Sequence, residues 1–114
     1  MKFNQNGWMV MDINIAQLDD QQFYNLKIVF KEDTIFRKLD DEMIIIDMNS
    51  GKYFGLNETG ARIWTLLNEF NDIKKVQGSL LDEYNISAEE CLKELKRFLQ
   101  TIYEKGLVDV KKNN

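Results

Sequence analysis

The sequence contains no histidine and no proline, and it has a single cysteine, Cys91. Histidine is the commonest general base near neutral pH and a frequent metal ligand, so its absence weighs against histidine-assisted or metal-dependent catalysis. One cysteine cannot form an internal disulfide. No apolar run reaches the roughly 18 residues of a membrane-spanning helix, and the N-terminus lacks the pattern of a signal peptide. We therefore expect a cytoplasmic protein with no membrane span, no bound metal and no cofactor.

The length and composition of the chain are those of a single globular domain. The chain has 114 residues, of which 44% are hydrophobic and 30% are charged, and its net charge is −4. A chain of this length can bury a real core. The negative balance weighs against a nucleic-acid partner, because phosphate contacts require a cationic surface.

Signals for catalysis are weak. Adjacent carboxylates occur at Asp19-Asp20, Asp40-Asp41 and Glu89-Glu90. Neighbouring residues on a helix or strand do not share a face, so these pairs suit turns and helix caps better than acid–base chemistry. Cys91 lies within an apolar pattern and has no histidine to activate it, which favours a buried structural thiol. With no phosphate-binding loop or dinucleotide motif present, we predict a protein without catalytic residues.

Three strand patterns follow one another in the middle of the chain. Residues 34–39 are β-branched and aromatic, residues 42–48 are apolar on both faces, and residues 52–56 include two aromatic residues. Turn signals at Asp40-Asp41 and Asn49-Ser50-Gly51 separate them. This order predicts a three-stranded antiparallel meander.

Helix patterns follow the strands. Asn57 caps the first helix, whose apolar residues lie almost all round it and include Trp64, so this helix is expected at the centre of the core. The second helix begins at Asn71 or Asp72 and repeats apolar residues at helical spacing.

The third helix has the clearest limits and the widest apolar stripe. A capping box at residues 87–90 starts it, it runs to about Lys105, and Gly106 ends it. Residues 107–110 are expected to return as a short strand. The stripe is roughly 140° wide and consists of Ala88, Cys91, Leu92, Leu95, Phe98, Leu99, Ile102 and Tyr103. Such a stripe either packs against two elements at once or has one edge that lines a ligand groove.

The last strand of the meander, residues 52–56, is expected to have one edge with unpaired backbone groups. This strand is short, and Gly55 within it allows another backbone to approach closely. A bulge or a tight strand-to-helix turn explains Gly55 equally well. The functional interpretation is that an extended peptide adds to this edge as a fourth strand.

The segments DEMIIIDMNSGKYFGLNETGARIWTLL, DEYNIS and LKRFLQTIYEKGLV resemble the PqqD-like family, the RiPP recognition elements of ribosomal natural-product pathways. The resemblance covers roughly Ile28 to Val110, and YFGLNETGARIW is its most specific part. It implies an α+β, winged-helix-like fold, in which a three-stranded antiparallel sheet is followed by a three-helix bundle.

The resemblance also implies a site between the third strand and the third helix, where the leader region of a precursor peptide binds as an added strand. The strand side is Lys52, Tyr53, Phe54, Gly55 and Leu56. The helix side is drawn from Leu92, Leu95, Lys96, Leu99 and Tyr103. The opposite edge of the helix, Cys91, Glu94 and Phe98, stays open, because helix phase alone does not choose between the two edges.

These expectations describe a non-catalytic adaptor that presents the leader peptide to a modifying enzyme, such as a radical SAM protein, a leader protease or a cyclase. The alternative is a winged-helix DNA-binding regulator, in which Lys93, Lys96 and Arg97 touch phosphates. Glutamates on the same helix and the negative net charge weigh against that alternative.

Residues 1–25 lie outside the family pattern and form an N-terminal extension, so we assign residues 26–114 to the peptide-recognition domain. Within the extension, Trp8–Ile15 is strand-like and Asp19–Phe23 has the pattern of a helical turn. The segment is too apolar for a solvated tail. It could pack on the sheet, occupy the leader groove of its own chain, or cross to a second copy. We expect it to pack on the sheet or to join two copies in a homodimer, with the leader groove left open.

Overall fold

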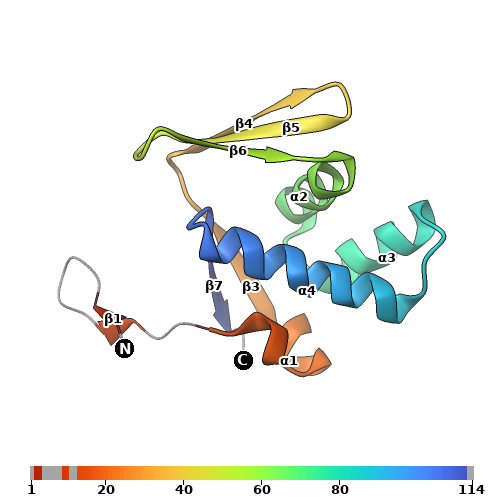
Figure 1. The fold of residues 1–114 in the computed structure, drawn as a ribbon. Helices are drawn as coiled ribbons and strands as arrows, with labels where there is room; N and C mark the ends of the chain where they lie inside the picture. Colours follow the sequence, from red (N-terminus) through yellow and green to blue (C-terminus); the bar gives the residue numbers. More distant parts are fainter. Residues whose placement is uncertain (1, 4–8, 11–12, 113–114) are drawn as a thin grey trace.

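A computed structural model of the protein describes residues 2–3, 9–10 and 13–112. A three-stranded antiparallel sheet in the order β4-β5-β6 forms one layer (Figure 1). Its strands are β4 (Thr34–Leu39), β5 (Glu42–Asp47) and β6 (Lys52–Leu56). Ile45 at the centre of β5 pairs with Phe36 on one side and Phe54 on the other. The predicted meander is therefore confirmed.

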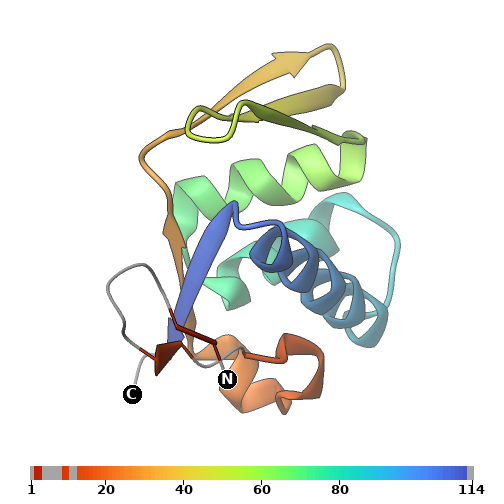
Figure 2. The same ribbon diagram turned by 60° about the vertical axis from the view of Figure 1, so that its left-hand side comes forward.

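Three long helices lie beneath the sheet, and Figure 2 shows α2 directly under it, with α3 and α4 further away. Their bounds are α2 (Glu58–Phe70), α3 (Ile73–Glu83) and α4 (Ala88–Glu104). The side-chain cap predicted at Asn57 is confirmed, because the Asn57 Oδ1 accepts a hydrogen bond from the Gly60 N–H at 2.9 Å. Of the capping box predicted at residues 87–90, the Ser87 half is present, since the Ser87 Oγ accepts a hydrogen bond from the Glu90 N–H at 3.1 Å. Asn71, at φ 47°, ends α2 in the left-handed region.

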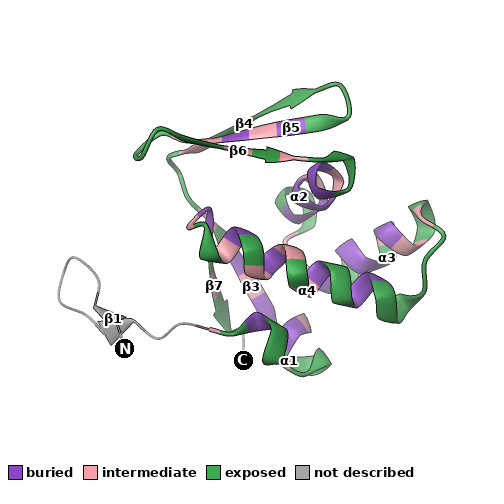
Figure 3. Ribbon diagram, in the orientation of Figure 1, coloured by how far each residue is buried: buried purple, intermediate pink, exposed green. Residues whose placement is uncertain are grey.

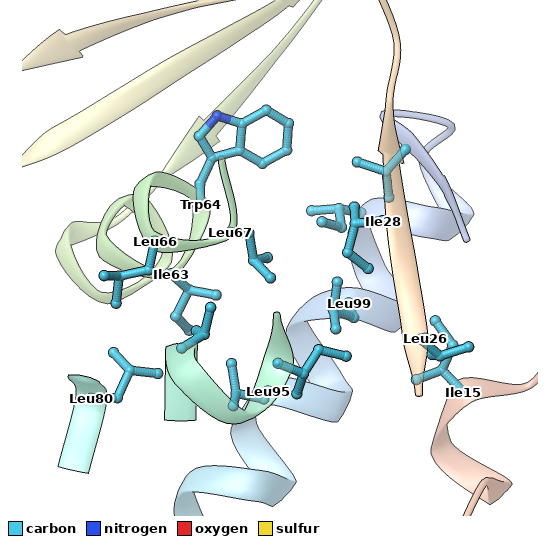
Figure 4. Close-up of a cluster of buried hydrophobic side chains, with 14 of the residues drawn as sticks. Ile15, Leu26, Ile28, Ile63, Trp64, Leu66, Leu67, Leu80, Leu95 and Leu99 are labelled. Carbon is cyan, nitrogen blue, oxygen red and sulfur yellow. The ribbon is translucent and has the colours of Figure 1, made fainter. Parts of the chain in front are cut away.

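One face of the three-stranded sheet packs against α2. Phe36, Ile45 and Phe54 lie in one cross-strand row on the face towards α2, where Ile45 is fully buried. The Trp64 ring from α2 meets the Phe36 ring at 6.0 Å in an edge-to-face arrangement. Trp64 is 1% exposed, which confirms its predicted place in the core (Figure 4).

A second sheet ties the two ends of the domain together. It pairs β3 (Leu26–Phe30) with β7 (Val108–Lys112) in antiparallel register. The expected strand after Gly106 is present, although it extends further than residues 107–110. The sequence analysis did not predict β3, whose partner lies about 80 positions away along the chain.

The described part of the N-terminal segment contains β1 (Lys2–Phe3), β2 (Met9–Val10), η1 (Ile15–Gln17) and α1 (Asp20–Tyr24). Of these, η1 and α1 pack on helices. The helical turn predicted at Asp19–Phe23 is confirmed, whereas Trp8, Met11 and Asp12 of the predicted strand lie outside the described residues and Ile15 starts a 3-10 turn.

The position of this segment differs from the expected one. Elements η1 and α1 contact α4 and α3, and the described residues of the segment do not pack on the three-stranded sheet. Ile15 and Phe23 are both fully buried in the same core as the helices (Figure 3). The boundary between the N-terminal extension, residues 1–25, and the peptide-recognition domain, residues 26–114, stays a prediction.

Candidate functional site: a groove between β6 and α4

A hollow of about 270 Å³ lies between β6, the start of α2 and the second half of α4. We call it the β6–α4 groove. Its lining residues are Phe54, Gly55, Leu56, Asn57, Thr59, Gly60, Ile63, Glu94, Arg97, Phe98, Thr101, Ile102, Lys105 and Leu107. The groove joins the strand edge and the helix that the sequence predicted to face each other.

The floor of the groove is apolar. Ile63 and Ile102 are buried beneath it, and Phe98 is half-buried at its side. A Cβ at Gly60 would lie 3.4 Å from Phe98 Cε1, closer than most side-chain contacts. Gly60 therefore allows the aromatic ring to sit against the first turn of α2. A side chain that enters the groove meets hydrocarbon on several sides.

The rim of the groove is charged. The Lys105 Nζ lies 5.5 Å from the centre of the Phe54 ring, in a cation–π arrangement. Further along α4, an Arg97 Nη1 lies 3.6 Å from a Glu94 carboxylate oxygen. Both members of this pair are largely exposed, so the interaction contributes little to stability and leaves both groups free to meet a partner.

The β6 strand presents a free backbone edge to this groove. Within the described residues, β6 pairs with β5 on one side and with no strand on the other. The β5–β6 register is continuous from Asp47↔Lys52 to Met43↔Leu56, so Gly55 does not mark a bulge. A Cβ built at Gly55 meets no atom within 4 Å. Packing inside this chain therefore does not require a glycine at that position.

The strand residues predicted for the site contribute unequally to the groove. Phe54, Gly55 and Leu56 line it, although Gly55 belongs to the other face of the strand and has no side chain. Lys52 begins the same strand but is not part of the lining, and Tyr53 lies on the opposite face of the sheet beside Ile46. The Tyr53 side chain is 72% exposed there, so any contact with a peptide would have to reach it from the outer face.

The helix residues on the first predicted edge of α4 lie away from the groove. Leu95 and Leu99 are fully buried and Leu92 is 9% exposed in the core. The Lys96 ammonium donates to the Leu18 carbonyl at 3.0 Å, and the Tyr103 hydroxyl accepts from the Ile13 N–H at 3.4 Å. This edge of α4 holds the N-terminal segment. A role for its residues in peptide binding stays a prediction without support from the geometry.

The other edge of α4 faces β6. Glu94 and Phe98 line the groove, while Cys91 from the same alternative edge lines a neighbouring pocket. Four further lining residues of α4 were not predicted for the site: Arg97, Thr101, Ile102 and Lys105. They follow Glu94 and Phe98 at spacings of three and four, which is the spacing of one helix face. This spacing is visible in the sequence, but it does not show which face of the helix meets the strand.

The single cysteine of the chain lies in the core. Cys91 is 1% exposed, and burial raises the pKa of its thiol, so the nucleophilic thiolate is disfavoured. Among the described residues, no group of three or more Cys, Asp or Glu side chains is placed to hold a metal ion. No helix in the same part of the chain is long and apolar enough to cross a membrane.

Comparison with known proteins finds one family and two solved structures that resemble this chain. The sequence model of a family described as Coenzyme PQQ synthesis protein D (PqqD) matches residues 42–108. The solved structure of TbiB1 in complex with the TbiA(beta) leader peptide is similar, with 27% sequence identity, a TM-score of 0.68, and coverage of 71% of this chain and 94% of that chain. A lasso peptide synthetase B1 complexed with the leader peptide has the same fold, with 22% identity, a TM-score of 0.67, and coverage of 73% and 98%. No curated protein sequence matches the chain. The two structures confirm the predicted winged-helix-like α+β fold.

Proposed function

The chain belongs to the PqqD family, and we propose that it is a non-catalytic adaptor for the leader region of a ribosomally made precursor peptide. The observation that carries this proposal is the free backbone edge of β6 beside a groove with an apolar floor. The similarity to TbiB1, which was solved with a leader peptide, supports the same conclusion. Neither the buried thiol of Cys91 nor the exposed carboxylates supply a competing catalytic site.

The peptide binds as a fourth strand beside β6. Main-chain hydrogen bonds to the free edge provide affinity, and alternate side chains of the peptide point towards α4 and select the register. The strand edge offers five residues, Lys52–Leu56, and an apolar side chain of the peptide fits against Phe98 and Ile102. On the helix side, the contacts come from Glu94, Phe98 and the lining residues that follow them, in place of the edge around Lys96.

Binding of the leader raises the local concentration of the peptide's core at a modifying enzyme, so the adaptor acts by tethering and needs no cofactor. A radical SAM protein, a leader protease or a cyclase would serve as that enzyme. The DNA-binding alternative gains no support from the cations of α4. Lys96 is held by Leu18 and Asp20, and Arg97 lies beside Glu94.

Titration of the protein with the leader peptide of its neighbouring precursor gene tests this proposal. We expect saturable binding, and Phe98→Ala should weaken it about tenfold or more, because buried aromatic anchors at the centre of a site carry much of the binding energy. Phe70→Ala is the matched control, since Phe70 is 39% exposed at the end of α2 and does not line the groove. Absence of leader binding, or equal losses in both variants, would contradict the proposal.

A further inference from the structure

A second hollow continues from the β6–α4 groove along α4. It has a volume of about 280 Å³ and lies between α2, the end of α3 and the start of α4. We call it the α3–α4 pocket. Thr59, Ile63 and Glu94 line both hollows. A chain that leaves the groove past Thr59 therefore enters the pocket directly.

The pocket has an apolar interior and an acidic rim. Leu80 and Cys91 are buried in its wall, and Ile86, in the turn between α3 and α4, is 36% exposed at its mouth. Glu90 and Glu94 are four positions apart on α4, so their carboxylates share one face of the helix. No ion pair to Glu90 occurs among the described residues.

The two ends of the combined hollow have opposite charge. Lys105 lies beside Phe54 at one end and Glu90 lies at the other, while Glu94, with Arg97 beside it, lies where the two hollows join. The helix axis from Lys105 to Glu90 is about 22 Å long at ~1.5 Å per residue. An extended peptide needs about seven residues at ~3.3 Å each to cover that length. The five residues of β6 are therefore too few to pair with the whole of such a peptide.

We propose that the α3–α4 pocket is a second subsite for the same peptide, and that it takes an apolar side chain just beyond the part that pairs with β6. A basic residue of the peptide lies next to this side chain, against Glu90 and Glu94. The inference rests on the proposed function, because the continuity with the strand groove identifies the occupant. The cognate leader is then recognised as an extended segment with an apolar and basic end beside α3 and an acidic or polar end beside Lys105.

Calorimetric titration of the full chain with the leader peptide of the neighbouring precursor gene tests the subsite. Ile86→Ala should weaken binding about fivefold, because it removes part of an apolar contact. Val29→Ala is its control, since Val29 is 40% exposed on β3 and does not line the groove or the pocket. An unchanged melting temperature of each variant shows that the fold is kept.

The charge at the rim is tested by reversal. Glu90→Lys should weaken binding about tenfold at low salt and less at high salt, since the contact is electrostatic. Glu89→Lys is the matched control. Glu89 lies in the same first turn of α4, but it lines a hollow on the other side of the helix, so its reversal should change the affinity by less than about twofold.

The outcomes separate the subsite from the function on which it rests. If Phe98→Ala weakens binding while Ile86→Ala and Glu90→Lys do not, the subsite is wrong and the adaptor stands. If the leader does not bind the wild-type protein, both proposals fail. Ile86→Ala could instead change how many copies of the protein associate in solution, measured as the molecular mass of the assembly. If it does so and leaves leader affinity unchanged, the pocket is a contact between two copies and the subsite is again wrong.

Discussion

At the scale of single residues, two neighbouring cations on α4 have different surroundings because they lie on different faces of the helix. The Lys96 side chain is 18% exposed and bridges to the Leu18 carbonyl and to Asp20, which lies 3.3 Å away. Arg97, the next residue, is 68% exposed and lines the groove. The sequence alone predicted Lys96 for the site, since both cations flank the same apolar stripe. The edge around Lys96 stays a prediction, because the choice of edge depends on where α4 docks and helix phase alone does not show this.

These two residues give a paired prediction. Arg97→Gln should weaken leader binding by ~0.5–1 kcal/mol, with a smaller effect at high salt, because it removes an exposed charge at the rim. Lys96→Gln should instead lower the free energy of unfolding and leave leader affinity almost unchanged. Urea unfolding and titration of both variants provide the measurements. A reversed pattern would show that the first edge of α4 is the one that meets the peptide.

At the scale of elements, local signals in the sequence were sufficient where an element has a cap or a turn. The side-chain caps at Asn57 and Ser87 and the glycine turns placed the meander and the helices within a few residues. The strand β3 was missed because its partner β7 lies about 80 positions away along the chain, so no local signal shows the pairing. The docking of η1 and α1 on the helices was missed for the same reason, because the residues in contact lie far apart in the sequence.

The N-terminal segment supplies a prediction at this scale. Ile15 in η1 is fully buried, and its N–H donates to the Gln100 Oε1 at 2.7 Å. Ile15→Ala should therefore cost ~2–5 kcal/mol of unfolding free energy. Ile35→Ala is the control, because Ile35 is 42% exposed on the outer face of the sheet and should cost much less.

The same variant tests whether the segment competes with the leader. Gln100, Lys96 and Tyr103 hold the segment on the edge of α4 that faces away from the groove. Leader affinity of the folded Ile15→Ala protein should thus stay within about twofold of wild type, because distant sites without shared partners behave independently. An affinity that rises tenfold or more would mean that the segment occupies the leader groove.

At the scale of the whole molecule, α4 separates the N-terminal segment from the β6–α4 groove. One edge of the helix holds the N-terminal segment, its central stripe enters the core through Leu95 and Leu99, and the other edge faces β6. The wide stripe seen in the sequence therefore packs against two elements and also borders a groove. The expected homodimer stays a prediction, and residues 13–24 of the segment thought to form it pack within their own chain.

The most direct test of the central claim is residue-resolved amide hydrogen exchange by NMR, with and without the leader peptide. Over the residues that the structure describes, the three-stranded sheet has two edges without a neighbouring strand, β6 beside the groove and β4 on the far side. We predict that the groove-facing amides of Lys52–Leu56 exchange more slowly when the leader is bound, whereas the free-edge amides of Thr34–Leu39 exchange as before. Slower exchange along β4, or no change along β6 at saturating leader, would contradict the account.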